Sequence, residues 1–469
     1  MMKEISDIKE EVLKKILPSK EERRNVDKIA QEVLHIINKI IYEKKYQKIV
    51  KAELEGSYAK DTWLSGEVDL DIFLLFDPST KTQELKEIGL EIGRKTSLFL
   101  NSTPIEQYAT HPYIQFFYKN IKIEIVPAYN VPSPDMIISP VDRTPFHTRY
   151  IKEKLQENPE LKNEIRLLKK FMKGINVYGA EIRIGGFSGY LTEILAIYFG
   201  SFEKLLINSA KWIPWHIVID PANHYTSIRE VFKLFNSPLI IIDPVDKKRN
   251  AAAAVTLQKL SEFIVASRAF LYSPSIKFFY PKPISLDYNY IKNELSRRNI
   301  LLLKTKKPEN INEEILWGQL KRIQKSLIRI LKSFGVNIFD STIWVSENSI
   351  IILFEVERLY FPSVIKHIGP PVYSDNILDF LDKYNLDKTV IGPYIENSRP
   401  IVLKKPRYVN VVEVINDNIR KIRITQDLSN MFSTNLEIVV KNDIFTYCKD
   451  KDFCRFLQKW LLRKFPWII

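Results

Sequence analysis

Apolar residues recur through the first fifty positions at the spacing of helices that are buried on one side. The two sets are Val12, Ile16 and Leu17, then Ile29, Val33, Ile36, Ile37 and Ile40. Residues three or four apart share one face of a helix, because an α-helix turns about once every 3.6 residues. The pattern therefore predicts helices over residues 1–50.

Two later stretches have the pattern of β-strands. Residues 67–76, EVDLDIFLLF, end in an unbroken apolar run, and residues 113–126 hold two apolar runs on either side of Lys119-Asn120. A turn signal between two such runs favours a hairpin. We therefore predict a strand over the first stretch and a hairpin over the second. Residues 160–270 follow a mostly helical pattern.

The pattern changes near residue 285. NILLLKTKKP predicts a strand, EEILWGQLKRIQKSLIRILKSF a long helix, STIWVSENSIIILFEVERL a hairpin and SDNILDFLDKYN a second helix. This β-α-β-β-α order favours a ferredoxin-like fold. The exposed face of the long helix carries Lys321, Arg322, Lys325, Arg329 and Lys332. That face is either simply solvated or a track for the backbone of an RNA.

Composition narrows the class of partner. The chain has 70 Lys and Arg against 56 Asp and Glu, a net charge of +14, and such an excess is typical of proteins that bind polyanions. Cys448 and Cys454 cannot build a disulfide framework or a four-ligand zinc site, and we interpret them as an idle or buried thiol pair. The charged N-terminus lacks the apolar segment of a signal peptide. The sequence contains no run of about 18 apolar residues, which is the length needed to span a bilayer. We therefore expect a soluble, cytoplasmic protein without membrane contact.

The candidate chemistry begins in EGSYAKDTWLSGEVDLDIFLLF, residues 55–76. Asp69 and Asp71 alternate with apolar residues, so both carboxylates point to one face of the strand, about 7 Å apart. Two carboxylates at the edge of a core repel each other and lose hydration. A divalent cation relieves both costs, and Mg²⁺ prefers carboxylates together with water and substrate phosphates. The pair therefore predicts a magnesium site for phosphoryl transfer.

A third carboxylate on a neighbouring strand would complete such a site. Glu124 is the candidate, because it alternates with Ile123 and Ile125 in an otherwise apolar segment; the alternative is an edge strand whose acidic residue lies in water. Gly56-Ser57 precedes the carboxylates. Glycine lets a backbone approach a phosphate, and serine adds a hydroxyl beside the N–H groups of a helix start.

This constellation resembles the polymerase-beta-type nucleotidyltransferase superfamily, in which a Gly-Ser pair precedes carboxylates at i and i+2 and a third on a nearby strand. Further motifs resemble the archaeal, class I CCA-adding enzymes, in the same order. They are GSYAKDTWL, DLDIFLLF, VDRTPFH at 141–147, RLLKKF at 166–171, YGAE at 178–181, GGFSGYL at 185–191 and DPVDKKRN at 243–250, with KHIGPP at 366–371 in the C-terminal half.

The resemblance implies a tRNA nucleotidyltransferase that adds C, C and A to the 3′ end of tRNA. It implies that Asp69, Asp71 and Glu124 are catalytic and hold two Mg²⁺ ions. The family has Asp at the third position, so the longer arm of Glu124 would shift that carboxylate outward. The nucleotide-binding residues that it implies are Gly56, Ser57, Lys60, His111, Thr144, His147, Lys169, Tyr178 and Arg249, the last near the base. From their charge, the candidate RNA contacts are Lys321, Arg322 and Lys325.

The expected fold class is α+β, with a polymerase-beta-like head, a helical central domain and a ferredoxin-like body. The expected domains are a nucleotidyltransferase catalytic domain over 1–155, a helical central domain for the nucleotide and the tRNA end over 156–284, a ferredoxin-like (βαββα) tRNA-binding domain over 285–405 and a C-terminal tail over 406–469. The tail is a candidate to fold back on the central domain.

The expected partners are CTP, ATP and tRNA, the last held by its acceptor and T-stem and its 3′ end; a homodimer is a candidate assembly. In the reaction that the resemblance implies, the 3′-hydroxyl attacks the α-phosphorus, pyrophosphate leaves, and Glu124 or Asp71 accepts the proton. One alternative is a poly(A) polymerase or an oligoadenylate synthetase of the same superfamily. Another is a catalytically silent RNA-binding protein, which the three filled acidic positions disfavour.

Overall fold

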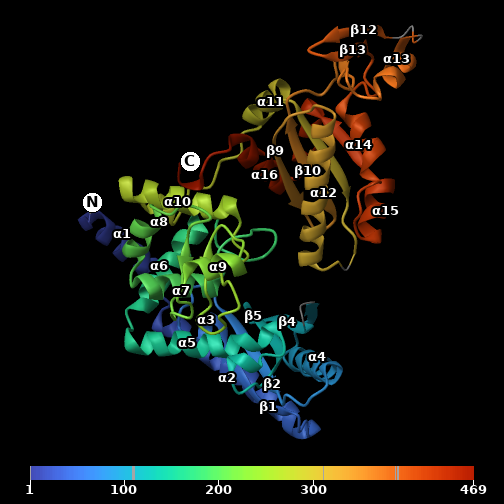
Figure 1. The fold of residues 1–469 in the computed structure, drawn as a ribbon. Helices are drawn as coiled ribbons and strands as arrows, with labels where there is room; N and C mark the ends of the chain where they lie inside the picture. The colour runs from blue at the N-terminus through green and yellow to red at the C-terminus, as the bar shows by residue number, and fades with distance from the viewer. Residues whose placement is uncertain (1, 108–110, 310, 386, 388–389, 469) are drawn as a thin grey trace. The chain divides into compact units, whose positions relative to one another are not determined.

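The computed structural model describes residues 2–107, 111–309, 311–385, 387 and 390–468 (Figure 1). Contacts within the chain divide it into two compact units, Met1–Pro283 with Lys464–Ile469, and Ile284–Arg463. We propose that these units divide further into the four domains expected from the sequence.

The N-terminal part of the first unit contains a five-stranded sheet with the strand order β1-β2-β5-β4-β3. β2 and β5 run parallel, and the other neighbours are antiparallel. Side chains of two long helices, such as Val33 and Ile92, share a fully buried core with Ile72 and Ile123 of the sheet. The elements are α2 (Lys20–Lys44), β1 (Ile49–Glu55), α3 (Gly56–Ala59), β2 (Asp69–Phe76), α4 (Thr82–Phe99), β3 (Ile105–Gln107), β4 (Tyr113–Tyr118) and β5 (Ile121–Tyr129).

The predicted strand and hairpin are both present in this sheet. The hairpin turns at Lys119 and Asn120, whose φ angles of 49° and 64° are the left-handed pair that a two-residue turn requires. β1 was missed, because the helical prediction ran to residue 50. Its middle carries Lys51 and Glu53, which are exposed or half-exposed, so the strand has no clear alternation of apolar and polar residues.

The rest of the first unit is helical, as predicted for residues 160–270. Phe171 lies in its core, with the rings of Phe202, Phe263, Phe270 and Phe279 centred between 5.3 and 6.4 Å away. The elements are α1 (Met2–Ile16), α5 (Thr144–Glu157), α6 (Leu161–Gly174), α7 (Gly189–Phe199), α8 (Phe202–Ser209), β6 (Val218–Ile219), α9 (Ile228–Leu234), β7 (Ile240–Ile241) and α10 (Leu257–Tyr272).

Both ends of the described chain join this helical core. Ile5, Val12 and Ile16 of α1 are buried in it. Trp467 also belongs to it and stacks on Phe278, with the ring centroids 5.2 Å apart.

The second unit contains the ferredoxin-like fold. Its four-stranded sheet has the order β14-β8-β10-β9, which is the arrangement of a β-α-β-β-α-β chain. Alternate residues of each strand face opposite sides: Leu301 and Leu303 pack with α12 and α14, whereas Ile300 and Leu302 pack with α11 and α16. The elements are α11 (Tyr288–Arg297), β8 (Ile300–Lys306), α12 (Glu313–Ser333), β9 (Ile338–Val345), β10 (Ser349–Val356), α14 (Val411–Ile419), α15 (Gln426–Thr434), β14 (Glu437–Val440) and α16 (Lys451–Leu462).

One helix of the predicted β-α-β-β-α order lies elsewhere. The SDNILDFLDKYN helix exists as α13 (Ile377–Asn385), but its Phe380 and Tyr384 pack against Val402 of a separate three-stranded sheet. That sheet consists of β11 (Ile365–Ile368), β12 (Ile391–Glu396) and β13 (Arg399–Lys404). The second helix and fourth strand of the ferredoxin-like fold are instead α14 and β14. They come from the region that the sequence assigned to the tail, because the small sheet is inserted between β10 and α14.

Cys448 and Cys454 form a disulfide, with their Cα atoms 4.7 Å apart. The interpretation as an idle thiol pair was therefore wrong. Both residues are buried beside Phe453 and Leu457 under the four-stranded sheet. Among the described residues, no helix is both long enough and apolar enough to cross a membrane.

Candidate active site

Three carboxylates meet where β2 and β5 run side by side. Asp69 and Asp71 lie two residues apart on β2, and the parallel register sets Asp71 opposite Glu124 of β5. Leu70 and Ile72 are fully buried on the other side of β2. The alternation of the strand therefore presents both aspartates to one face, and the structure brings the three predicted carboxylates together.

Lys122 joins this group, and sequence reasoning missed it. It lies opposite Asp69 in the register of the two strands and two residues before Glu124. Its Nζ is 3.1 Å from Oδ2 of Asp69 and 3.1 Å from Oε1 of Glu124. Partial burial alone would lower the pKa of Lys122, but Glu124 and Asp69 together raise it above its ordinary value. The ammonium is therefore the counter-ion of two of the three carboxylates.

Asp71 is held in an environment that resists ionisation. Withdrawal from water, followed by repulsion from Glu124 and Asp69, raises the pKa of Asp71 to about 7. A carboxylate with like charges on both sides gains most from a nearby cation. Lys122 alone therefore does not neutralise the three carboxylates Asp69, Asp71 and Glu124.

The turn at Gly56 and Ser57 between β1 and β2, which we call the glycine corner, lies against Asp71. Gly56 begins α3 with a φ of +67°, and a Cβ placed on it would lie 1.8 Å from Oδ2 of Asp71. Only glycine permits this approach. Ser57 follows as the second residue of α3, which has four residues. Glu55, at the end of β1, is buried opposite Asp71, and burial raises its pKa.

A divalent cation fits the chemistry of this face. In the part of the chain that the structure describes, no three His, Cys, Asp or Glu side chains are arranged to hold a metal ion as they stand. Lys122 bridges Asp69 and Glu124 instead. The donors are nevertheless the hard carboxylate oxygens that Mg²⁺ prefers, and Asp71 lies beside two like charges, Glu124 and Asp69, whose repulsion such an ion would relieve.

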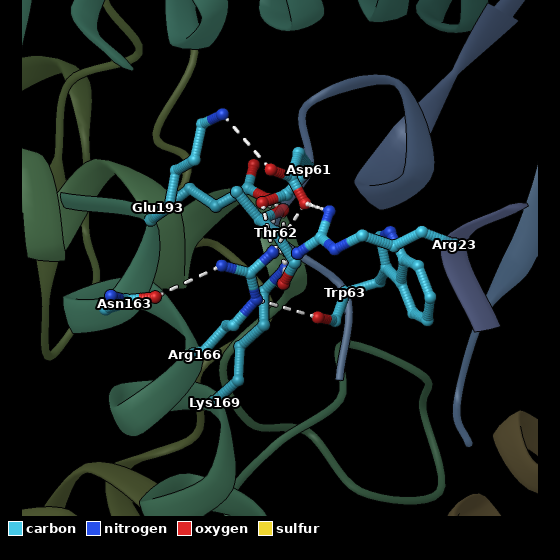
Figure 2. A network of polar contacts seen from close by, with 9 residues as sticks. Arg23, Asp61, Thr62, Trp63, Asn163, Arg166, Lys169 and Glu193 are labelled. Carbon is cyan, nitrogen blue, oxygen red and sulfur yellow. Dashed lines mark hydrogen bonds and ion pairs between the residues drawn. The ribbon is translucent and has the colours of Figure 1, made fainter. Parts of the chain in front are cut away.

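Lys60 and Lys169, both predicted to bind the nucleotide, share one buried carboxylate. The carboxylate of Glu193 on α7 forms ion pairs with Nζ of Lys60 at 2.6 Å and with Nζ of Lys169 at 3.1 Å. Thr62 also donates its hydroxyl to Glu193 at 2.6 Å, and Figure 2 shows this residue between Glu193 and Lys169. Lys60, Lys169 and Glu193 are only 8, 4 and 1% exposed. Two ammonium groups on one carboxylate leave the cluster with an excess of positive charge.

The pKa values of the cluster reflect this arrangement. Burial lowers the pKa of Lys169 to about 8, although Glu193 opposes the shift. Burial by itself would raise the pKa of Glu193, but Lys60 and Lys169 hold it at about 2. Glu193 was not predicted. Its partners lie more than a hundred residues away or one helix earlier, so no local pattern marks it.

A neighbouring ionic cluster fixes the loop between α3 and β2 (Figure 2). Asp61, with a φ of +52°, accepts Arg23 of α2 at 2.5 Å and Arg166 of α6 at 2.6 Å. Lys162 adds a contact at 3.1 Å. Arg166 is 2% exposed and also donates to the carbonyl of Trp63 at 3.0 Å. The loop that precedes the two aspartates is therefore tied to both helices.

His147 and Arg249, also predicted, converge on a second buried acid. Asp243 accepts His147 at 2.9 Å and Arg249 at 2.6 Å, and it accepts the hydroxyl of Tyr190 at 2.9 Å. The ring of His147 stacks on that of Tyr190, with the centroids 3.8 Å apart. Burial by itself would raise the pKa of Asp243, but His147, the amide of Val245 and Arg249 hold it well below its usual range.

The other predicted nucleotide-binding residues lie in three places. Thr144 is the half-buried first residue of α5, one turn before His147. Tyr178 lies under the Nζ of Lys173, 5.1 Å from its ring centroid, and burial raises the pKa of the phenol. His111 is 3% exposed, its ring lies 6.0 Å from that of Tyr129, and neither ring nitrogen has a hydrogen-bond partner among the described residues.

The predicted RNA contacts lie on α12 in the second unit. Arg322 and Lys325 are exposed, and Lys321 is half-buried. The opposite side of the helix carries Leu320 and Ile323, which are fully buried against the ferredoxin-like sheet. The structure thus places these basic side chains away from the core, as either reading of the helix requires.

The carboxylate face and the glycine corner are typical of a nucleotidyltransferase. Residues 34–147 match the family described as "Nucleotidyltransferase domain". Residues 163–280 match "tRNA nucleotidyltransferase, second domain", and residues 298–440 match "CCA-adding enzyme, C-terminal domain".

Two relatives are similar in sequence to nearly the whole chain. A CCA-adding enzyme of Saccharolobus islandicus (strain M.14.25 / Kamchatka #1) is 35% identical over 461 residues, 96% of this chain and 98% of the relative. A CCA-adding enzyme of Methanothermobacter thermautotrophicus is 34% identical over 463 residues, 97% of each chain. The chain belongs to the CCA-adding enzyme family and is a tRNA nucleotidyltransferase. The resemblance noted from the motifs and the expected α+β fold class are confirmed.

Similarity to solved structures is weaker. A Cid1 poly(U) polymerase with Mg and 3′-dATP bound is similar over 59% of this chain and 96% of that chain, with a TM-score of 0.46 and 16% sequence identity.

Proposed function

We propose that the enzyme adds C, C and A in turn to the 3′ end of tRNA, from CTP and ATP, without a template and with release of pyrophosphate. The observation that carries the proposal is the register that sets Asp71 opposite Glu124, with Asp69 on the same face. Membership of the family supports the choice of tRNA as the acceptor.

Asp69, Asp71 and Glu124 would hold the divalent ions, which we propose are two Mg²⁺. When bound, Mg²⁺ supplies Lewis-acid stabilisation of the attacking 3′-oxygen and of the pyrophosphate. Asp71 or Glu124 would accept the proton of the 3′-hydroxyl.

The triphosphate would lie along the positive groups of the first unit. Ser57, at the glycine corner, offers a hydroxyl. Lys60 and Lys169 carry more positive charge than Glu193 neutralises, and this excess would attract phosphate oxygens. Thr144 and His147 share the start of α5 and would contact the triphosphate and the sugar.

Base choice would come from protein groups and from the RNA end together. Arg249 is about one-third exposed and is held by Asp243, so its remaining N–H donors can face a base edge. One pocket would serve both C and A, because an arginine can donate to acceptors on either base. Asp243 and Tyr190 would orient Arg249 and His147.

The tRNA would be recognised by shape and charge rather than by base sequence. A-form RNA presents its backbone and 2′-hydroxyls more readily than its base edges. Lys321, Arg322 and Lys325 of α12 would contact phosphates of the acceptor and T-stem. This mode of binding suits an enzyme that serves every tRNA.

The proposal is tested by incorporation of each labelled nucleotide into a tRNA that lacks its last three residues. We expect incorporation from CTP, followed by incorporation from ATP when both nucleotides are present, and poor use of UTP and GTP. Addition of a long A tail to this tRNA would contradict the proposal and favour a poly(A) polymerase. Equal use of an unstructured RNA would contradict the choice of tRNA.

A further inference from the structure

Lys122 has a position that the proposed chemistry does not use. On β5, Ile121, Ile123 and Ile125 are buried in the core of the sheet. The alternation of the strand therefore sends Lys122 and Glu124 to the opposite side, which is the face of the carboxylates. The chain thus places a cation among the three residues that would hold a metal.

The contacts of Lys122 join two strands. Its Nζ is 3.1 Å from Asp69 of β2 and 3.1 Å from Glu124 of β5, and its side chain is 30% exposed. On the other side of β5, the register sets Phe117 of β4 opposite Lys122 and Gln115 opposite Glu124. Both of these residues are uncharged. The two bridges therefore run toward the carboxylate face and not toward the neighbouring strand.

Without a cation, the three carboxylates would repel one another at one edge of a core. A single ammonium at equal distance from two of them reduces this repulsion and fixes their separation. A divalent ion needs the same oxygens, and its charge is repelled by an ammonium that stays nearby. The ammonium and the ion therefore compete.

We propose that Lys122 is the resident counter-ion of the carboxylate site. It holds Asp69 and Glu124 in place before a divalent ion binds, and it weakens the binding of that ion. This inference rests on the proposed function, because it takes Asp69, Asp71 and Glu124 as the metal ligands. Lys122 acts through these ligands and is a positioning residue.

Binding of Mn²⁺, followed by electron paramagnetic resonance of the free ion, tests the proposal on the full-length protein without nucleotide or tRNA. Two neutral variants, Lys122→Gln and Lys122→Met, are used so that failure of one to fold leaves the other. We expect both to bind Mn²⁺ at least about tenfold more tightly than the parent, because the repulsion between the ammonium and an ion a few ångströms away is lost.

Two variants serve as matched controls. Lys122→Arg keeps the charge and should bind Mn²⁺ within about twofold of the parent. Lys95→Gln removes one positive charge from α4, where Lys95 pairs with Glu91, and should also match the parent. Thermal melting gives a second readout. Without metal, the neutral variants should melt below the parent, and Mn²⁺ should raise their melting temperature by more than it raises that of the parent.

Asp71→Asn separates the two claims. If it abolishes Mn²⁺ binding while the neutral Lys122 variants bind Mn²⁺ no more tightly than the parent, the counter-ion role is wrong and the metal site stands. If Asp71→Asn leaves Mn²⁺ binding unchanged, the ion lies elsewhere, and both the metal site and the role of Lys122 are overturned.

Discussion

Gly56 and Asp71 are in such close contact that a methyl group on the glycine would lie 1.8 Å from Oδ2 of the aspartate. The sequence suggested that the glycine allows a phosphate to approach the backbone. The structure shows a second requirement, which is room for a carboxylate of the site. Gly56 at the start of α3 and Asp71 on β2 are therefore coupled sterically.

Gly56→Ala should displace Asp71 and reduce addition of both C and A by roughly a hundredfold, as small misplacements of reacting groups do. Gly200→Ala is the matched control. Gly200 also has a left-handed φ, +76°, but a Cβ there would have no neighbour within 4 Å. It should cost only the backbone strain of roughly 1–2 kcal/mol and keep activity. Single-turnover rates and thermal melts of both variants check this. Equal loss of activity in the two variants would show that strain, and not the contact with Asp71, is responsible.

The carboxylates themselves should be needed for both nucleotides. Asp69→Ala and Asp71→Ala should each lower addition of C and of A by at least roughly a hundredfold and leave tRNA binding nearly unchanged. Glu124→Asp should keep substantial activity, whereas Glu124→Gln should lose most of it because the charge is lost. Initial rates and filter binding measure the two properties. If Glu124→Gln is as active as the parent, the third carboxylate lies elsewhere.

The buried cluster around Glu193 gives a prediction for stability. Glu193→Gln leaves Lys60 and Lys169 without their counter-ion and should cost about 3 kcal/mol at pH 7, as removal of one partner from a buried pair does. Denaturant unfolding of parent and variant measures this. Glu10→Gln, which removes an exposed partner of Lys14, should change the free energy of unfolding very little. An unchanged stability in Glu193→Gln would contradict the buried ion pairs.

The same cluster predicts how the cost of Glu193→Gln depends on pH. The folded protein holds the pKa of Glu193 at about 2, below its ordinary value of 4.5. A depressed carboxylate pKa contributes stability above the unfolded value and loses it as the pH falls toward the folded value. The difference in unfolding free energy between parent and variant should therefore shrink as the pH falls from 4.5 to about 2. A difference that stays constant over this interval would be inconsistent with a depressed pKa.

The α12 surface should control binding of tRNA but not of nucleotide. Replacing Lys321, Arg322 and Lys325 together by Gln should weaken tRNA binding and flatten its salt dependence by about one slope unit per lost phosphate contact. Replacing the exposed Lys20, Arg24 and Lys28 of α2 removes the same net charge and serves as the control. Binding isotherms at several salt concentrations decide the question. If the α12 variant keeps the slope of the parent, its basic face is only solvated.

Sequence alone located the carboxylates because strand alternation is a local rule. Asp69, Asp71 and Glu124 each sit between apolar residues. Alternation placed the two aspartates on one face, whereas the edge-strand alternative for Glu124 was excluded only by the fold, in which β5 lies between β2 and β4. Lys122 obeys the same rule, but a lysine on a strand is also typical of a solvated edge, so its contacts required the fold. Glu193 and Asp243 were not predicted, since their partners come from distant segments.

The fold was predictable to a similar extent. The helices and the β4–β5 hairpin follow from periodicity and from the turn at Lys119 and Asn120. The order of helices in the ferredoxin-like fold does not, because α13 has the amphipathic pattern of a core helix yet packs on an inserted sheet. The Cys448–Cys454 disulfide was also missed, since two cysteines carry no spacing signal that separates a bridge from two thiols.

The base-selecting role of Arg249 can be separated from the metal site. Arg249→Ala should weaken addition of both C and A, because one pocket serves both bases, while Mn²⁺ binding stays at the level of the parent. Steady-state rates with each nucleotide and the Mn²⁺ titration measure the two effects. Loss of addition of one base only would show that the two bases are read by different groups.

A single carboxylate site should add C, C and A in this order. Three tRNAs lack the last three, the last two or the last residue. Each is incubated with each of the four nucleotides in a separate reaction, and the products are resolved at single-nucleotide length. We expect addition of C to the first tRNA, C to the second and A to the third, no extension beyond A, and no addition by Asp71→Asn at any stage. UTP and GTP should be poor substrates throughout, since a pocket that pairs with one base edge leaves polar groups unsatisfied with another. Continued addition of A would contradict ordered addition of C, C and A, and addition that survives in Asp71→Asn would contradict the carboxylate site.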